Sequence, residues 1–251
     1  MKYFTWNFDD GLEEDKETIK ILKENGMGAT FNLNSALFGK RQMIGRIRNL
    51  GIKEVPLSEY DANKASLLKY SIHYRIPKDE IADVYSGFEI ASHTAEHVNM
   101  VKCSEEECIR QVKSDQDVLG KMFHTGIHGF AYPFGRCNSR SMAVLKQCGI
   151  TYARTASFAK NFSLTDNLLE LPVTSWHIRK DAVKKVREFI DSESDRDQFF
   201  LMFAHGYEFD FHTKESNFEK FKRICDMVAG RDDIVCCSTG EAIRAISNNA
   251  Q

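Results

Sequence analysis

The chain has 251 residues, 42% of them hydrophobic and 28% charged, a composition typical of a globular domain with a sizeable core. Its 34 basic and 36 acidic residues leave a formal net charge of −2, which gives no reason to expect a nucleic-acid or membrane partner. The seven cysteines are scattered without a C-x-x-C pair, which argues against a disulfide framework. No apolar run resembles a signal peptide or a membrane span, so we expect a cytoplasmic protein.

Short apolar runs alternate with amphipathic segments along the chain, as in proteins built from strand–helix units. Several runs are apolar at nearly every position. This is typical of strands that helices cover on both faces, and it favours a parallel sheet. In chain order, the predicted strands are 3–8, 29–33, 88–91, 129–132, 151–155, 171–175, 199–204 and 234–237.

Four predicted helices lie between these strands, and each of them stops at a glycine, a common residue at helix C-termini. The second begins with Ser104 and Glu107, whose spacing is that of a capping box. The glycines that end the four helices are Gly26, Gly120, Gly149 and Gly230.

Seven or eight such units predict an α/β fold, a distorted or incomplete (β/α) barrel of about seven to eight parallel strands. No repeat, low-complexity tract or linker divides the chain, so we expect residues 1–251 to form a single domain. The stretch from about 39 to 87 is longer than one unit needs. We expect it to form an enlarged insertion with extra helices at the rim of the barrel.

Asp9 and Asp10 stand side by side after the first predicted strand and before Gly11. Adjacent residues that leave a strand point to opposite sides, so one carboxylate can bind a metal while the other lies beside it. Asp-Gly is also a common turn pair, and these residues alone fit a plain strand-ending turn equally well.

His93 and His97 also follow a predicted strand, and at the start of a helix their i,i+4 spacing would place both imidazoles on one face. Two histidines and one carboxylate are a known ligand set for a catalytic zinc with an open position for water. A lone histidine pair is often incidental, but barrel active sites are built at strand ends such as this one. His124 and His128 have the same spacing but precede a strand, and we interpret them as surface structure or as structure at the bottom face of the barrel.

Two later strand ends carry further candidate groups. Pro133 and Gly135 force an irregular backbone, which can aim a backbone N–H at a developing oxyanion, although Pro-x-Gly also makes ordinary turns. His205 ends the apolar strand at 199–204, where an imidazole could act as general acid to a leaving nitrogen. A single histidine is by default a core residue, and the position at a strand end favours the functional interpretation.

Together these motifs resemble those of the polysaccharide deacetylases, carbohydrate esterase family 4. They occur in the family's order, and they span most of the chain. FDDG at 8–11 is similar to the T-F-D-D-G of the family with Asn7 in place of the threonine, HTAEH at 93–97 matches H-[ST]-x-x-H, YPFG at 132–135 matches the third motif, and FLMFAH at 200–205 resembles the late L-x-H.

The resemblance assigns roles that spacing alone does not. It implies that Asp10, His93 and His97 hold one divalent metal ion, with Zn²⁺ expected and Co²⁺ or Ni²⁺ as alternatives. It implies that Asp9 is the general base and His205 the general acid. The resemblance also implies that the backbone N–H of Phe134 contributes to the oxyanion site.

Two departures indicate a branch of the family with altered third and fourth motifs. Many members begin the third motif with an arginine that braces the catalytic aspartate, and Ala131 stands there instead. The fourth motif normally supplies an aspartate that tunes the late histidine, and the stretch 171–177 contains none. Arg154 and His177 are the nearest candidates to replace these groups. The predicted substrate-binding residues are Tyr132, Trp176, Arg154 and His177.

These features predict a metal-dependent hydrolase that removes N-acetyl or related acyl groups from an amino-sugar substrate. A first alternative is hydrolysis of a small, non-polymeric amide or formamide on the same metal site, which would suit a cytoplasmic enzyme. A second is a catalytically silent carbohydrate-binding domain, against which the retention of both aspartates and all three histidines argues. We therefore expect a carbohydrate or small amide as partner, and neither nucleic acid nor membrane.

Overall fold

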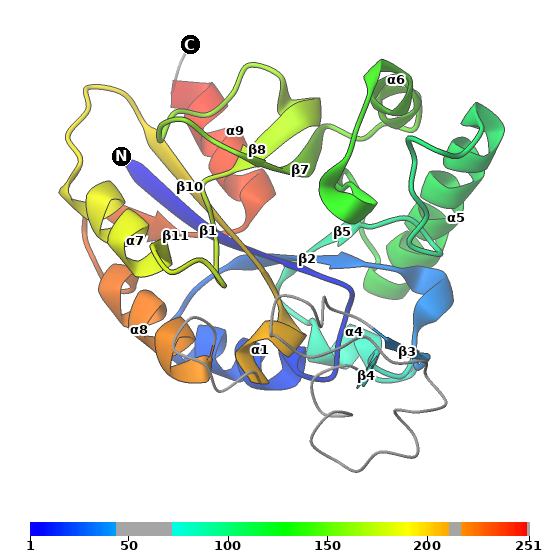
Figure 1. Ribbon diagram of the computed structural model, residues 1–251, viewed down its shortest axis with the longest axis horizontal. Coiled ribbons are helices and arrows are strands. Elements are labelled where there is room, and N and C mark those ends of the chain that lie inside the picture. The colour runs from blue at the N-terminus through cyan, green and yellow to red at the C-terminus, as the bar shows by residue number, and fades with distance from the viewer. Residues whose placement is uncertain (44–71, 211–216, 250–251) are drawn as a thin grey trace.

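Parallel strands form a nearly closed barrel with helices around its outside (Figure 1), which confirms the predicted fold. The structure is a computed structural model, and it describes residues 1–43, 72–210 and 217–249. The eight expected strands are present with small shifts at their ends: β1 (Lys2–Asp9), β2 (Ala29–Leu33), β5 (Glu89–Ser92), β6 (Gly129–Ala131), β7 (Tyr152–Phe158), β8 (Leu171–Val173), β10 (Gln198–His205) and β11 (Ile234–Cys236).

The strand order is β8-β7-β6-β5-β2-β1-β10-β9, and all of these pairings are parallel. The two-residue strand β9 (Ser175–Trp176) follows β8 after a single intervening residue. One segment therefore pairs with β7 through β8 and with β10 through β9, and it closes the ring of strands. The amide of Thr174, between the two, donates to Leu201 O of β10 (2.9 Å).

The last strand, β11, lies beside the N-terminal end of β1. It pairs with residues 2–4 of β1, whereas β2 pairs with residues 6–9 of the same edge. The amide of Gly28, just before β2, donates to Cys236 O of β11 (3.2 Å). A Cβ on Gly28 would lie 2.9 Å from the Cα of Cys237, so the close approach of the two segments requires glycine there.

Helices connect most of the strands. Ser104 accepts a hydrogen bond from the amide of Glu107 (3.2 Å), which confirms the predicted N-terminus of helix α5 (Glu105–Phe123), but this helix runs three residues past Gly120. It ends where His124 adopts a left-handed conformation (φ 52°). In the described residues the helices are α1 (Asp15–Glu24), α4 (Ile81–Val84), α5 (Glu105–Phe123), α6 (Ser139–Gln147), α7 (Ala182–Asp191), α8 (Phe218–Val228) and α9 (Thr239–Asn249), with short 3₁₀ turns η1 (Ser35–Leu37), η3 (Pro133–Gly135), η4 (Leu168–Glu170) and η5 (Gly206–Asp210).

The predicted rim insertion at about 39–87 falls largely on residues 44–71, which lie outside the described residues. On either side of them, β3 (Arg41–Met43) and β4 (Ile72–Tyr74) pair antiparallel. The segment after β4 returns to the barrel, where the amide of Ile76 donates to Gly11 O (3.0 Å).

The outward side chains of β1 form the centre of the core between the strands and helices α1, α7 and α8. Phe4, Trp6 and Phe8 are fully buried and pack in one apolar cluster. The rings of Trp6 and Phe221 of α8 meet edge to face with centroids 4.7 Å apart. This packing fixes which face of β1 points into the barrel, because successive side chains alternate along a strand.

The inward side chains of β1, namely Thr5, Asn7 and Asp9, are polar although they are buried. The amide of Asn7 donates to Thr239 at the start of α9 (3.1 Å), and its oxygen accepts from Asn32 of β2 (2.6 Å). A column of hydrogen-bonded groups therefore runs inside the barrel from α9 towards Asp9.

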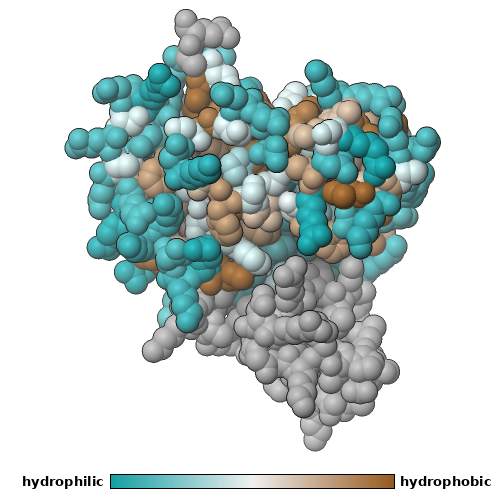
Figure 2. All heavy atoms as spheres, turned by 45° about the horizontal axis from the view of Figure 1, so that its top comes forward, coloured by the Kyte–Doolittle hydropathy of each residue, from teal (hydrophilic) through white to brown (hydrophobic). Residues whose placement is uncertain are grey.

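On the face shown in Figure 2, hydrophilic side chains dominate the periphery and less polar ones gather towards the middle. Within the described ranges, no helix has the length and apolar character needed to cross a bilayer. All seven cysteines are free thiols, as the scattered spacing predicted.

Candidate active site

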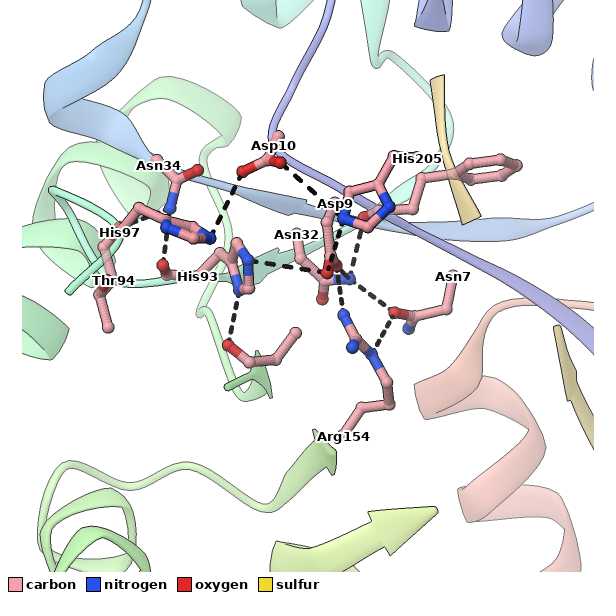
Figure 3. Close-up of polar contacts among 12 residues, drawn as sticks. Asn7, Asp9, Asp10, Asn32, Asn34, His93, Thr94, His97, Arg154 and His205 are labelled. Atoms are coloured by element: carbon pink, nitrogen blue, oxygen red, sulfur yellow. Dashed lines mark hydrogen bonds and ion pairs between the residues drawn. The ribbon is translucent and has the colours of Figure 1, made fainter. Parts of the chain in front are cut away.

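The carboxyl ends of the strands bring the candidate residues together (Figure 3). In the strand register, Asp9 of β1 lies opposite Asn32 of β2 on one side and His205 of β10 on the other. His93 follows β5 directly, so its imidazole approaches from the next strand beyond β2. Asp9, Asp10, His93, His97 and His205 all point into one space.

A sharp turn after β1 separates the two carboxylates. Asp10 (φ 81°) and Gly11 (φ 68°) both adopt left-handed conformations, and a Cβ on Gly11 would touch Leu33 at 3.0 Å. The amide of Asp10 donates to Asn32 O (3.1 Å), which ties the turn to β2. Left-handed backbone at a residue other than glycine is strained and is common at functional sites.

Each aspartate has its own buried arginine. Arg154 of β7 donates to Oδ1 of Asp9, and its Nε donates to the side-chain oxygen of Asn7 (3.1 Å). Arg75, which follows β4, donates to Oδ1 of Asp10 (3.0 Å). Both guanidinium groups are 1% exposed, so each charge is paired within the protein rather than hydrated.

These charges keep both carboxylates ionised. Burial by itself would raise the pKa of Asp9, but Arg154, His93 and His205 outweigh it and hold the pKa below its ordinary value. Burial likewise opposes ionisation of Asp10, whose pKa is nevertheless held far below its ordinary value, mainly by His97 and Arg75.

Asp10, His93 and His97 form a cluster that could hold a metal ion, because one ligand atom from each lies within 4.8 Å of the others. Nδ1 of His93 bonds Ala131 O (2.7 Å), which fixes the ring and leaves Nε2 free to face the cluster. Nε2 of His97 lies 3.7 Å from Oδ1 of Asp10. Burial lowers the pKa of His93 to about 4 and also lowers that of His97, which favours the neutral imidazoles that metal ligation requires.

The histidine pair lies on a turn, so the predicted helix start at this position is wrong. Thr94 (φ 61°) and His97 (φ 55°) have left-handed backbone, and the next helix, α5, begins only at Glu105. The side-chain amide of Asn34 donates to the carbonyls of His93 (2.6 Å) and Thr94 (2.9 Å) and holds the turn in place. The two imidazoles still meet, with ring centroids 4.8 Å apart.

Asp115 of α5 stabilises this turn through hydrogen bonds. The sequence alone did not point to this residue. Its carboxylate accepts hydrogen bonds from the amides of Ser35 (2.8 Å) and His93 (3.2 Å) and from the hydroxyl of Ser92 (2.5 Å). Burial raises its pKa to about 6, partly opposed by these hydrogen bonds. Its only sequence signal is a charged residue on the buried face of an amphipathic helix.

Glu208 is a second residue that sequence reasoning missed. Its Oε1 accepts hydrogen bonds from Nδ1 of His205 (2.9 Å) and from Nε1 of Trp176 (2.7 Å). Nε2 of His205 lies 3.9 Å from Oδ2 of Asp9 and equally far from Oδ2 of Asp10. Burial lowers the pKa of His205, but Glu208 and the two aspartates outweigh it and raise the pKa to about 9.

Phe134 borders the cluster. Its backbone is left-handed (φ 62°), and its ring is 59% exposed with its centroid 4.8 Å from that of His97. Gly135, also left-handed (φ 65°), packs directly against Ala156 of β7, where a side chain would not fit. The irregular backbone expected from Pro133 and Gly135 is therefore present.

Two predicted substrate-binding side chains do not reach the cluster. Tyr132 is fully buried, and its hydroxyl donates to Leu169 O (3.0 Å). His177 is also fully buried, in the core behind the strands, where its ring lies 4.5 Å from that of Phe209. Both side chains are therefore buried away from the space into which the candidate catalytic residues point. His124 and His128 are exposed, as expected of surface residues.

The family model described as polysaccharide deacetylase matches residues 2–153, more than half of the chain. The chain belongs to the polysaccharide deacetylase family. The matched stretch includes Asp9, Asp10 and both histidines of the HTAEH turn. A search of curated protein sequences gives no match.

Solved structures of this family share the fold. A putative polysaccharide deacetylase from Mycobacterium smegmatis has 13% identity and a TM-score of 0.61, over 99% of this chain and 91% of that one. A family 4 carbohydrate esterase from Streptomyces lividans, in complex with acetate, has 15% identity and a TM-score of 0.53, over 94% and 91%. A mutant of BA3943, a family 4 pseudoenzyme with restored enzymatic activity, has 12% identity and a TM-score of 0.55, over 97% and 68%.

Proposed function

We propose that this deacetylase removes N-acetyl groups from an amino-sugar substrate with the help of one divalent metal ion. The observation that carries the proposal is the position of Asp9. Its ionised carboxylate lies 3.6 Å from Nε2 of His93, in the candidate metal cluster, and 3.9 Å from Nε2 of His205. A base, an acid and a set of metal ligands therefore meet at the same strand ends.

The donor set of Asp10, His93 and His97 fits a catalytic zinc, since two neutral imidazoles and one carboxylate leave a coordination position open. Co²⁺ and Ni²⁺ suit the same donors, so the choice of Zn²⁺ is part of the proposal. An ion bound there would supply a Lewis acid that polarises the attacking water and the acyl carbonyl.

The protein's own groups would handle the protons. Asp9 accepts a proton from the attacking water, because Arg154 keeps the carboxylate ionised and fixes its orientation. The backbone N–H of Phe134 stabilises the developing oxyanion. His205, whose pKa of about 9 keeps it protonated near pH 7, donates a proton to the departing amine. Trp176, half-buried beside His205, would line the acyl site.

Asp9→Asn tests the assignment of the base. We expect the variant to keep its metal content and to lose deacetylation of N-acetylglucosamine oligomers by at least about 100-fold, the usual contribution of a general base. Metal content is measured by elemental analysis of protein purified without chelators, in parallel with activity. Asp10→Asn is the matched control and should lose the metal itself. Full activity of Asp9→Asn would exclude Asp9 as the base.

The same assay tests the substrate. Small amides and formamides are supplied alongside the sugar oligomers, and preferential turnover of the small amides would replace the amino-sugar proposal with the first alternative. The BA3943 pseudoenzyme shows that this fold can exist without activity. In the present chain both carboxylates and the three histidines are in place, which supports an active enzyme.

A further inference from the structure

Glu208 lies outside all the motifs that identify the family, yet it contacts the candidate acid directly. It sits in the 3₁₀ turn η5, three residues after His205, and is 1% exposed. The turn begins directly after His205, the last residue of β10, and its tight winding brings the carboxylate of Glu208 back to the imidazole. One oxygen, Oε1, accepts from both His205 and Trp176.

The turn that carries Glu208 is fixed by its packing. Gly206 lies against the first turn of α1, where a Cβ would come within 2.5 Å of Oδ1 of Asp15 and 3.1 Å of Glu14. A side chain at this position would have to displace Asp15 and crowd Glu14, so the packing favours glycine. The path determines where the side chain three residues after His205 points.

The imidazole of His205 is also confined by aromatic rings. Tyr207 stacks on it with centroids 4.8 Å apart and planes inclined by 28°, and Phe203 meets it edge to face at 4.9 Å. Within this enclosure, Nδ1 faces Glu208 and Nε2 faces the two aspartates. If the imidazole were flipped, it would lose its hydrogen bond to Glu208. Leaving a buried carboxylate without this partner costs free energy.

We propose that Glu208 is the positioning residue for His205 and supplies the carboxylate that the fourth motif lacks in this chain. Trp176 is its second anchor, because the indole N–H holds the same oxygen. This inference rests on the proposed function. As the C–N bond breaks, its electron pair stays on the nitrogen, which takes the proton from Nε2 of His205. Nδ1 keeps its proton in the hydrogen bond to Glu208, and the ring becomes neutral.

A comparison of two substrates tests this role. Amine departure from an N-acetyl amide needs a proton, whereas nitrophenolate leaves p-nitrophenyl acetate without one. We expect Glu208→Gln to lower kcat on the amide by about 100-fold or more and on the ester by less than about threefold, with KM little changed. Glu208→Asp, which keeps the charge, should recover part of the amide activity. Glu106→Gln, at an exposed site in α5, is the matched control and should match the unaltered protein.

A measurement without turnover separates this inference from the proposed function. In the unaltered protein the Nδ1–H proton of His205 should give a strongly downfield NMR signal, which Glu208→Gln should shift upfield. If the protein hydrolyses neither substrate, the proposed function fails, and this signal still tests the contact.

Equal losses of activity on the amide and on the ester, with metal content unchanged, would mean that Glu208 has only a structural role. Unchanged amide activity, or an unchanged signal, would overturn the inference. Circular dichroism of each variant checks folding, and Glu208→Asp carries the test if Glu208→Gln unfolds.

Discussion

Two adjacent carboxylates buried at one site would normally share a proton, because like charges in a desolvated space repel each other. Here Asp9 and Asp10 are each paired with a separate arginine, one from β7 and one from the segment after β4. Arg154 therefore acts on the candidate base, and Arg75 acts on the candidate metal ligand.

Replacing Arg75 should weaken metal binding. Arg75 bridges Oδ1 of Asp10 (3.0 Å) and the side-chain oxygen of Asn34 (3.3 Å), and Asn34 holds the turn that carries His93 and His97. We expect Arg75→Met to bind Zn²⁺ about tenfold to 100-fold more weakly, as found when groups that orient metal ligands are removed. The measurement is calorimetric titration of metal-free protein with Zn²⁺.

Arg154→Met is the matched control for that experiment. Arg154 contacts Asp9 but none of the three candidate ligands in the described hydrogen bonds. We expect this variant to keep its affinity for Zn²⁺ and to lose deacetylase activity instead. Equal metal affinity in the Arg75 variant and the unaltered protein would show that Arg75 does not organise the ligands.

Sequence reasoning located the groups at strand ends but not the groups that support them. Asp9, Asp10, His93 and His205 stand directly at or after predicted strands, where barrel sites are built, and the family motifs gave them roles. Arg75 contacts Asp10 across the fold, and no local pattern marks it. Asp115 is marked only by its charge on the buried face of α5, and Glu208 contacts His205 three residues away through a turn that the sequence pattern did not predict. Arg154 was noted as a candidate because it lies on a strand, and the structure places its guanidinium on Asp9.

At the scale of elements, continuous apolar runs allowed the strands to be predicted, since burial on both faces leaves a strong signal. Other features depend on pairing between residues distant in the sequence. These are the pairing of β11 with the start of β1 and the division of one segment into β8 and β9, which pair with different strands. The left-handed turn at His93–His97 depends on Asn34 and Asp115, which lie on other elements. Periodicity along the chain contains no information about such contacts.

The first turn of α1 contains a buried acid that should make stability depend on pH. Asp15 is fully buried; Oδ2 accepts from the hydroxyl of Tyr85 (2.7 Å), and Oδ1 has no hydrogen-bond partner in the described part of the chain. Burial raises the pKa of Asp15 to about 8, partly opposed by the hydrogen bond from Tyr85. The folded protein therefore keeps this carboxyl protonated in a range where the unfolded chain ionises it.

The sign of the effect follows from these two pKa values. Below about pH 4 the carboxyl is protonated in both states, so the stabilisation is fully present. Between about pH 4 and the folded-state value, the unfolded chain binds fewer protons, and the free energy of unfolding falls by at most about 1.4 kcal/mol per pH unit. Asp15→Asn does not ionise. We therefore expect the free energy of unfolding of Asp15→Asn, minus that of the unaltered protein, to increase from pH 4 to pH 8. The measurement is urea unfolding of both proteins at each pH. A difference independent of pH would contradict this.

At the scale of the whole molecule, the ligands of the candidate metal site come from two strand ends, so a bound ion would link β1 and β5 across β2. An ion that binds only the folded state stabilises it by about 2.7 kcal/mol at 100 times its Kd. We expect added Zn²⁺ to raise the Tm of the chelator-treated protein in a thermal scan. Asp10→Asn should show no such rise, and an equal rise in both would place the binding elsewhere.

The pairing of β1 with β10 also has a consequence for synthesis on the ribosome. Met1, next to β1, bonds Asp197, 196 residues further along the chain. At about 5–20 residues per second, β1 emerges roughly 10–40 s before its neighbour β10. During that interval the apolar side chains of β1 lack the ring partners Phe200, Phe209 and Phe221. We therefore expect nascent chains to depend on chaperones that shield extended apolar segments until the last third of the protein has been made.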